Sequence, residues 1–203
     1  MSQELLINVT PRETRVALVD NGSLQEVHIE RARRRGLVGN IYLGEVSRVL
    51  PGMQAAFVDI GLSRTAFLHA SDIAAAEGLF DSKPRQTLPI QQLLKEQQRV
   101  LVQVIKDPMG SKGARLTTQI SIPSRHLVFL ANNPIVGISG RIEDADERER
   151  LKQSAERFLA QQPDHGVIMR TAADSVGESE LLRDWTFLAR VWSAVFKRAA
   201  DAQ

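Results

Sequence analysis

Two phenylalanines stand where the pattern of a β-strand predicts solvent rather than core. Side chains alternate between the two faces of a strand, so residues 54–60 divide into two sets. The apolar set is Ala56, Val58 and Ile60, and the opposite set is Ala55, Phe57 and Asp59. The same alternation over residues 65–69 turns Ala66 and Leu68 inward and Thr65, Phe67 and His69 outward. Two exposed rings on neighbouring strands, with basic residues nearby, form a platform on which single-stranded nucleic acid can stack. The alternative is that the connection 70–98 covers both rings as part of the core.

A lysine in a glycine-flanked loop is the second candidate. The segment Gly110-Ser111-Lys112-Gly113 places Lys112 where it suits contact with a phosphate backbone. It is not a nucleotide-binding P-loop, because the GxxxxGK[ST] spacing and the following helix are both missing. The alternative is an ordinary surface lysine.

The third candidate is the pair Arg170-Thr171 at the end of a predicted strand. A guanidinium and a hydroxyl side by side can hold one terminal phosphate through charge-assisted hydrogen bonds. The alternative is an ordinary ion pair or turn contact.

An acidic group near residue 144 suggests a metal site but has a simpler explanation. The group comprises Glu143, Asp144, Asp146 and Glu147. These acids precede a predicted helix, where capping and the helix dipole favour carboxylates. The chain has no cysteine and four histidines, which excludes thiol chemistry and thiolate zinc sites. We therefore assign no catalytic residue and no metal ligand in this chain.

The composition predicts a folded, mildly basic protein. The 203 residues are 43% hydrophobic and 25% charged, with a net charge of +2, which suits one sizeable domain or two small ones. Basic residues outnumber acidic ones over 99–125, so that stretch is either a polyanion-binding surface or a solvated face. The longest apolar run, 127–131, is far shorter than the ~20 residues of a membrane span. With no secretory leader in the sequence, we expect a cytoplasmic protein without membrane association.

The predicted elements explain how these side chains are positioned. Strands at 5–9, 14–20 and 24–29 form a meander around the hairpin turn Asn21-Gly22, and the basic segment 31–36 ends it. A meander this small needs a partner to cover its apolar face.

Short strands then predict a small antiparallel barrel. They lie at 39–49, 54–60, 65–69, 99–106 and 116–120, with a type II turn at Pro51-Gly52 and a short helix near 90–97.

The remainder predicts a small α+β unit. Strands at 126–130 and 166–170 flank a turn at 132–134 and a helix that begins with a capping box from Asp144 to Glu147. The buried stripe of that helix is Leu151, Ala155, Phe158 and Leu159, and the stripe of a second helix is Leu181, Trp185, Leu188, Trp192 and Phe196.

Three strings of the sequence resemble the ribonuclease E/G family of bacterial endoribonucleases. They are 39–46 (GNIYLGEV), 51–61 (PGMQAAFVDIG) and 168–172 (IMRTA), and the ribonuclease G branch is the nearer. The resemblance implies an α+β, multidomain fold. Residues 1–36 would belong to a ribonuclease H-like domain, 37–122 to an inserted OB-fold RNA-binding domain, and 123–203 to a sensor of the RNA 5′ end.

The resemblance also assigns roles to individual residues. Phe57, Phe67 and Lys112 correspond to the family's positions that bind single-stranded RNA. Arg170 and Thr171 correspond to its grip on a 5′ monophosphate. Ser124 and Val128 would lie near the end nucleotide, although better known members have glycine at the position of Ser124.

The activity implied is that of a magnesium-dependent, single-strand-specific endoribonuclease in rRNA maturation and mRNA decay, homo-oligomeric when full length. The family's magnesium-binding aspartates and zinc-linking cysteines lie farther along than this sequence extends. We therefore expect an N-terminal fragment that does not cleave RNA alone and holds no cofactor. The alternative is a stand-alone OB-fold RNA-binding module without nuclease activity, for which an end sensor would be unnecessary.

Overall fold

The computed structural model describes residues 2–33, 35–73 and 88–202. It divides the chain into two compact units, 1–37 and 38–203. Among the described residues, no helix combines the length and the apolar character needed to span a membrane.

The first unit is a three-stranded antiparallel meander. Its strands are β1 (Gln3–Val9), β2 (Glu13–Asp20) and β3 (Ser23–Arg31), in the order β1-β2-β3. Asn21 and Gly22 take φ values of 47° and 80°, the left-handed pair that a two-residue hairpin turn requires. The predicted meander and its turn are thus confirmed. Strands β1 and β3 expose their apolar side chains: Leu5, Leu6, Ile7, Val9, Leu24, Val27 and Ile29.

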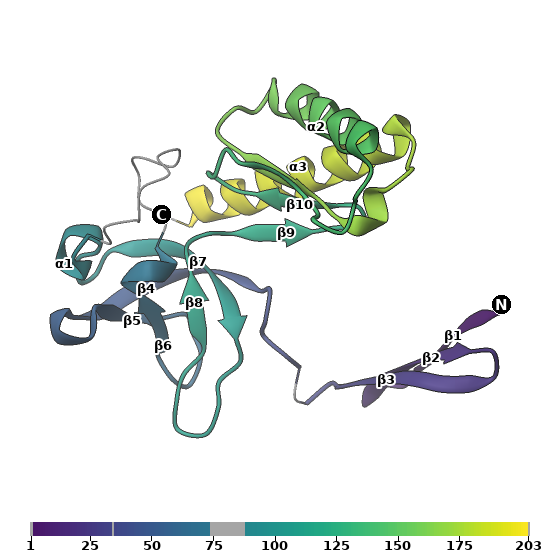
Figure 1. The fold of residues 1–203 in the computed structure, drawn as a ribbon. Coiled ribbons are helices and arrows are strands. Elements are labelled where there is room, and N and C mark those ends of the chain that lie inside the picture. The colour runs from purple at the N-terminus through teal and green to yellow at the C-terminus, as the bar shows by residue number, and fades with distance from the viewer. Residues whose placement is uncertain (1, 34, 74–87, 203) are drawn as a thin grey trace. The chain divides into compact units, whose positions relative to one another are not determined.

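The second unit begins with a closed five-stranded barrel (Figure 1). Its strands are β4 (Ile41–Leu50), β5 (Ala55–Asp59), β6 (Ala66–His69), β7 (Arg99–Lys106) and β8 (Arg115–Thr117). Strand β4 pairs with both β5 and β7, and β6 pairs in parallel with β8, which closes the ring β4-β5-β6-β8-β7. The barrel is filled by aliphatic side chains that are at most 1% exposed: Val46, Ala56, Val58, Leu68, Val102, Val104 and Leu116.

Two local predictions for the barrel were wrong. Ala55 is fully buried rather than outward, because its methyl group lies between its ladder partners Leu50 and His69. The type II turn is instead a 3-10 helix, Pro51–Met53, and the left-handed φ of 48° falls on Gln54. Gln54 stabilises that bend by donating its side-chain amide to the Pro51 carbonyl at 2.7 Å.

The helix predicted near 90–97 is shorter than expected. Helix α1 covers only Ile90–Leu93, because Leu94 is already extended and Gln97 has a φ of 67°. A second 3-10 helix, Ala70–Asp72, follows β6.

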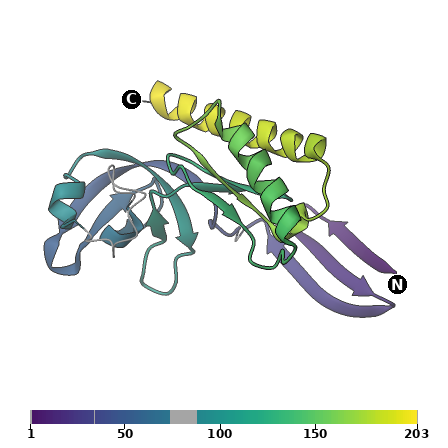
Figure 2. The same cartoon turned by 45° about the horizontal axis from the view of Figure 1, so that its top comes forward.

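The rest of this unit is a four-stranded sheet covered by two helices on one face (Figures 1 and 2). The strands are β9 (Ser121–Pro123), β10 (Leu127–Leu130), β11 (Val136–Ile138) and β12 (Gly166–Met169), in the order β11-β12-β10-β9. The helices are α2 (Ala145–Leu159) and α3 (Glu178–Asp201), and a 3-10 helix, Thr171–Ala173, precedes α3. Strands β10 and β12 and both helices were predicted; β9 and β11 were not.

The core of this helix-covered unit is built around Phe129. Its ring is fully buried and lies 5.4 Å from the ring of Trp185, 6.2 Å from that of Trp192 and 5.0 Å from that of His165. The stripe predicted for α3 holds through Trp192, but Phe196 is 60% exposed. Phe196 therefore lies outside the buried stripe, and its neighbour Val195 packs against the core instead.

The start of α2 matches the predicted cap in part. Asp144 accepts the Glu147 N–H at 2.7 Å, as an N-cap residue does. The Glu147 carboxylate does not return this bond; it accepts from Arg150 at 2.7 Å and from the Ser175 N–H at 2.9 Å. The hydrogen bond from Arg150, opposed by partial burial and aided by the Ser175 N–H, lowers the pKa of Glu147. Of the acidic group, Glu147 thus connects α2 to the segment before α3.

Candidate nucleic-acid interface

A groove of about 1030 Å³ opens on the wall of the barrel. Strands β5 and β6 supply its aromatic floor, and the β7–β8 loop supplies one side. Its lining includes four cationic side chains, Arg64, Lys106, Lys112 and Arg115. A concave surface that combines rings and cations suits a strand of nucleic acid.

The register of the sheet places the two phenylalanines next to each other. Phe57 and Phe67 are direct ladder partners, with ring centroids 6.3 Å apart in an edge-to-face arrangement. Both side chains are half-buried and line the groove. His69 extends the row, its ring 6.4 Å from that of Phe67. Part of the connection that was the alternative cover for the rings, 74–87, lies outside the described residues.

The four cations differ in how they are held. Arg115 forms a salt bridge with Asp72 at 2.9 Å, and Arg64 donates to the carbonyl of Gly110. Lys106 and Lys112 are exposed. The arginines therefore stabilise the rim, whereas the lysines present charge to solvent.

Lys112 lies in a tight loop that packs against the start of β6. Its backbone pairs with Met109 in both directions, at 3.0 and 3.2 Å, with Gly110 between them at a φ of 58°. Gly113 follows, and a Cβ there would come within 2.0 Å of the Thr65 carbonyl oxygen. Glycine is thus required for the loop to approach the groove this closely.

The second candidate region lies at the end of β12, on the helix-covered unit. The Arg170 guanidinium donates to the Ser124 carbonyl at 2.5 Å, and the Arg170 N–H donates to the His126 carbonyl at 2.8 Å. The hydroxyls of Thr171 and Ser139 share a hydrogen bond of 2.9 Å. Val128 lies on β10, half-buried and paired with Ile168. The fold therefore places Ser124 in contact with Arg170, whereas the contact of Thr171 is with Ser139.

Asp184 on α3 is a residue that the sequence did not single out. Its Oδ2 accepts from the Ser124 hydroxyl at 2.8 Å, from the His126 N–H at 3.2 Å and from His126 Nδ1 at 3.0 Å. Burial acts to raise the pKa of this carboxyl, but the hydrogen bonds from Ser124 and His126 outweigh it and lower the pKa. The sequence signal that could have identified Asp184 is its position directly before the buried Trp185, which puts a carboxylate at the border of the apolar stripe.

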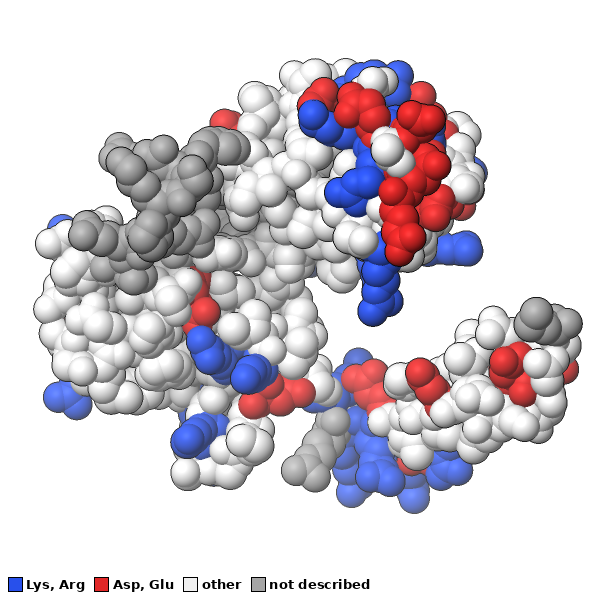
Figure 3. Space-filling view, viewed as in Figure 1, with Lys and Arg blue, Asp and Glu red and all other residues white. Residues whose placement is uncertain are grey.

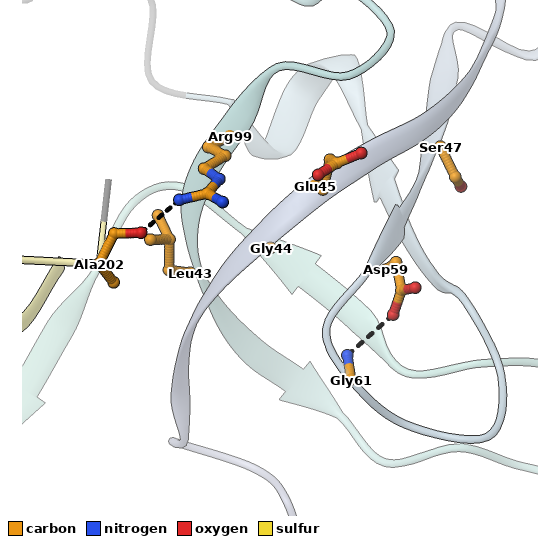
Figure 4. A pocket seen from close by; sticks show the side chains of 8 residues that line it. All are labelled: Leu43, Gly44, Glu45, Ser47, Asp59, Gly61, Arg99 and Ala202. Carbon is orange, nitrogen blue, oxygen red and sulfur yellow. Dashed lines mark hydrogen bonds between the residues drawn. The ribbon is translucent and has the colours of Figure 1, made fainter.

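A second hollow, of about 490 Å³, is lined by residues of β4, β5 and β7 together with Ala202 (Figure 4). Glu45 and Asp59 face it from paired positions on β4 and β5. Arg99 on β7 donates to the carbonyl of Ala202, at the end of α3. The hollow therefore lies between the barrel and the end of α3, and its carboxylates disfavour the binding of a polyanion.

Both parts of this unit carry charge of both signs. In the space-filling view, Lys and Arg lie over the β7–β8 loop of the barrel beside a few Asp and Glu, and the helix-covered unit shows Asp and Glu interspersed with Lys and Arg (Figure 3). Within the described residues, no three or more His, Asp or Glu side chains come close enough together to hold a metal ion.

Comparison with known proteins agrees with the division into a barrel and a helix-covered unit. Residues 37–118 match the S1 RNA binding domain, which has the OB fold, and residues 121–203 match the Ribonuclease E/G family. The barrel and the helix-covered unit thus correspond to two recognised sequence families.

Whole-chain relatives point to the same family. Over 206 residues the chain is 56% identical to Ribonuclease G of Escherichia coli strain K12, covering 100% of this chain and 42% of that protein. It is 53% identical to Ribonuclease G of Haemophilus influenzae, over 96% of this chain and 40% of that protein. Ribonuclease E of Escherichia coli strain K12 is 38% identical over 99% of this chain and 19% of its own length. The chain therefore spans less than half the length of the curated relatives that it matches.

Proposed function

This chain carries an S1 domain followed by a ribonuclease E/G family domain, and we propose that it is the RNA-binding, 5′-end-sensing N-terminal part of a single-strand-specific endoribonuclease. The observation that carries the proposal is the groove, where Phe57 and Phe67 are ladder partners and the exposed Lys112 shares the lining. Aromatic stacking and cationic contacts bind single strands with little sequence preference, because every base has a π-face and every nucleotide a phosphate.

The proposal gives each part of the chain a role. Residues 37–122 bind the RNA strand, and 123–203 sense its 5′ end. Residues 1–36 belong to a ribonuclease H-like domain; the exposed apolar side chains of β1 and β3 support this, since a lone meander cannot cover them. The barrel and its S1 match alone would also fit a stand-alone RNA-binding module. The match of residues 121–203 to the ribonuclease family favours the endoribonuclease.

Arg170 and Thr171 are proposed to bind a 5′ monophosphate, with Ser124 and Val128 beside the end nucleotide. Both Arg170 and Thr171 are exposed, and their side chains lie on consecutive residues after β12. A terminal phosphate carries more charge than an internal one, so a guanidinium and a hydroxyl gain more from it.

For the longer protein we propose a magnesium-dependent hydrolase that acts in rRNA maturation and mRNA decay as a homo-oligomer in the cytoplasm. Magnesium, held by carboxylates outside this chain, would orient and activate the attacking water. This chain supplies the strand-binding surface and the proposed 5′-phosphate site at Arg170 and Thr171, called the end site below. By itself it should leave RNA uncut. Cleavage by the pure chain in magnesium, lost on mutating Asp144 or Asp146, would overturn that assignment.

The test of strand binding is titration of a labelled single-stranded oligonucleotide. Phe57→Ala and Phe67→Ala should each weaken binding by about 1–3 kcal/mol. Phe187→Ala is the matched control, because Phe187 is 58% exposed on α3 and does not line the groove. Unchanged affinity in both groove variants would show that the rings only pack.

The test of end sensing compares 5′-monophosphate and 5′-hydroxyl forms of one oligonucleotide. Wild type should prefer the monophosphate, and Arg170→Ala and Thr171→Val should reduce that preference while leaving the 5′-hydroxyl form nearly unaffected. If Arg170→Ala weakens both forms equally, Arg170 is a general backbone contact instead.

A further inference from the structure

The three donors that converge on one oxygen of Asp184 all come from the loop 124–127. Ser124 contributes its hydroxyl, and His126 contributes its backbone N–H and its ring Nδ1. The loop is also closed on itself, because the Ser124 N–H donates to the Leu127 carbonyl at 2.8 Å. Asp184 therefore fixes this loop to α3.

The same loop holds Arg170 from its other side. The carbonyl of Ser124 accepts the guanidinium, and the carbonyl of His126 accepts the Arg170 N–H. Each of these two residues thus bonds Asp184 through its donors and Arg170 through its carbonyl. A continuous set of hydrogen bonds leads from α3 through the loop to the exposed guanidinium.

A serine, a histidine and an aspartate in contact also suggest a nucleophilic triad, but the bonds are arranged differently. In a triad the imidazole accepts the serine proton. Here the Ser124 hydroxyl donates to Asp184, and the His126 ring bonds the same carboxylate. The side chain of His126 is only 4% exposed, and its Nε2 faces Glu180 at 3.7 Å. The imidazole is therefore not placed to accept the Ser124 proton as it would in a triad, and we assign the cluster a structural use.

We propose that Asp184 is a positioning residue for the 5′-phosphate site: it holds the loop 124–127 so that the Ser124 carbonyl orients the Arg170 guanidinium toward a terminal phosphate. This inference rests on the proposed role of Arg170 in binding that phosphate. A long arginine side chain loses considerable rotamer freedom when it binds a ligand, and a carbonyl that orients it beforehand reduces that loss.

Electrostatics and positioning predict opposite effects for removing Asp184. Asp184 is an anion near a site for an anion, so its charge alone opposes phosphate binding. Removing it would then strengthen binding of the 5′-monophosphate. If Asp184 instead positions Arg170, removing it weakens that binding. The sign of the change therefore separates the two accounts.

The experiment measures the affinity ratio between 5′-monophosphate and 5′-hydroxyl forms of one 3′-labelled oligonucleotide of about ten nucleotides. Asp184→Ala should lower this ratio about three- to tenfold and leave the affinity for the 5′-hydroxyl form nearly unchanged, because the groove is untouched. Asp184→Asn keeps an acceptor oxygen and should retain more of the ratio than Asp184→Ala. Asp174→Asn is the control for charge. Among the described residues, this exposed carboxylate accepts a hydrogen bond only from the adjacent Ser175 hydroxyl, and asparagine keeps that acceptor. The affinity ratio of Asp174→Asn should equal or slightly exceed that of wild type.

The outcomes are distinct. If wild type discriminates and Asp184→Ala discriminates equally or better, the positioning role is wrong and the end site stands. If wild type does not discriminate, the end site fails and the positioning role fails with it. Thermal melting of each variant is measured in parallel. Should Asp184→Ala not fold, Ser124→Ala decides, because it removes the 2.8 Å hydroxyl bond to Asp184, together with the 3.2 Å hydroxyl contacts to the Leu127 backbone, and keeps the Ser124 carbonyl. A lower ratio supports the proposal and an unchanged ratio overturns it.

Discussion

In the groove, the half-buried rings of Phe57 and Phe67 share the lining with the exposed Lys112, whereas at the end of β12 the guanidinium of Arg170 is bonded to a loop that α3 holds in place. The groove is wide, and few polar contacts orient its side chains. The end site is small, and hydrogen bonds determine the position of its charged group. Stacking tolerates variation in base and position, but discrimination of one phosphate form from another requires donors in a fixed geometry. We therefore propose that affinity for RNA resides in the barrel and selectivity for the 5′ end in the helix-covered unit.

The largest expected effect is on the stability of the helix-covered unit. Phe129→Ala should destabilise the helix-covered unit by about 3–5 kcal/mol, because the fully buried ring leaves a cavity among Trp185, Trp192 and His165. Phe196→Ala is the matched control on α3 and should change stability by less than about 0.5 kcal/mol, since its side chain is 60% exposed. Chemical denaturation measures both. Equal destabilisation by the two substitutions would contradict the assigned core.

The next effect sharpens the role of the groove. Gly113→Ala should cost about 1–3 kcal/mol of stability, because the new Cβ would lie 2.0 Å from the Thr65 carbonyl oxygen and push the Lys112 loop away from β6. Binding of single-stranded RNA should weaken at the same time. Gly140→Ala is the control, since a Cβ there meets nothing within 4 Å. Wild-type affinity in a folded Gly113→Ala protein would show that the position of the loop does not matter.

A pH effect should be confined to the helix-covered unit. Burial among aromatic rings lowers the pKa of His165 below its ordinary value of 6.5, although Asp164 partly opposes this. The neutral ring is thus favoured in the folded state. Its contribution to the stability of the fold is fully present above the ordinary pKa and is lost as the pH falls through the lowered pKa. Melting temperature should therefore decrease from about pH 7.5 to about pH 5.5, and His165→Phe should show a smaller decrease. Parallel curves for the two proteins would rule out His165 as the cause.

The smallest effect is on the salt dependence of binding. Lys112→Ala should reduce the slope of log affinity against log salt by about 0.7, as expected when one contact to a single-strand phosphate is lost. Lys152→Ala, an exposed lysine on α2 outside the groove, should leave the slope unchanged. Identical slopes for wild type and Lys112→Ala would mean that Lys112 does not contact the backbone.

Features that depend on neighbouring residues were predictable from the sequence. The hairpin at Asn21-Gly22, the cap at Asp144 and the outward parity of Phe57 and Phe67 each follow from local geometry. The same holds for the α3 stripe as far as Trp192. Turn type, capping and face alternation are set within a few residues, so their pattern is visible in the sequence itself.

The remaining features needed the tertiary structure. The parallel pairing of β6 with β8 and the sheet order β11-β12-β10-β9 join segments far apart in the chain. Strands β9 and β11 have three residues each, too short for a periodic signal. Phe196 is exposed although Val195 packs against the core, and which of the two faces inward depends on how α3 packs on the rest of the unit.

Asp184 shows the difference most clearly. The sequence determined that α3 is a helix with one apolar face, and that Arg170 and Thr171 are adjacent at the end of a strand. Only the tertiary structure decided that Asp184 meets Ser124, 60 residues earlier, and that the carbonyl of Ser124 meets Arg170, 46 residues later. Periodicity reports which residues share a face of their own element. Which polar side chains meet across two elements depends on how those elements pack, and a single sequence carries no local record of that packing.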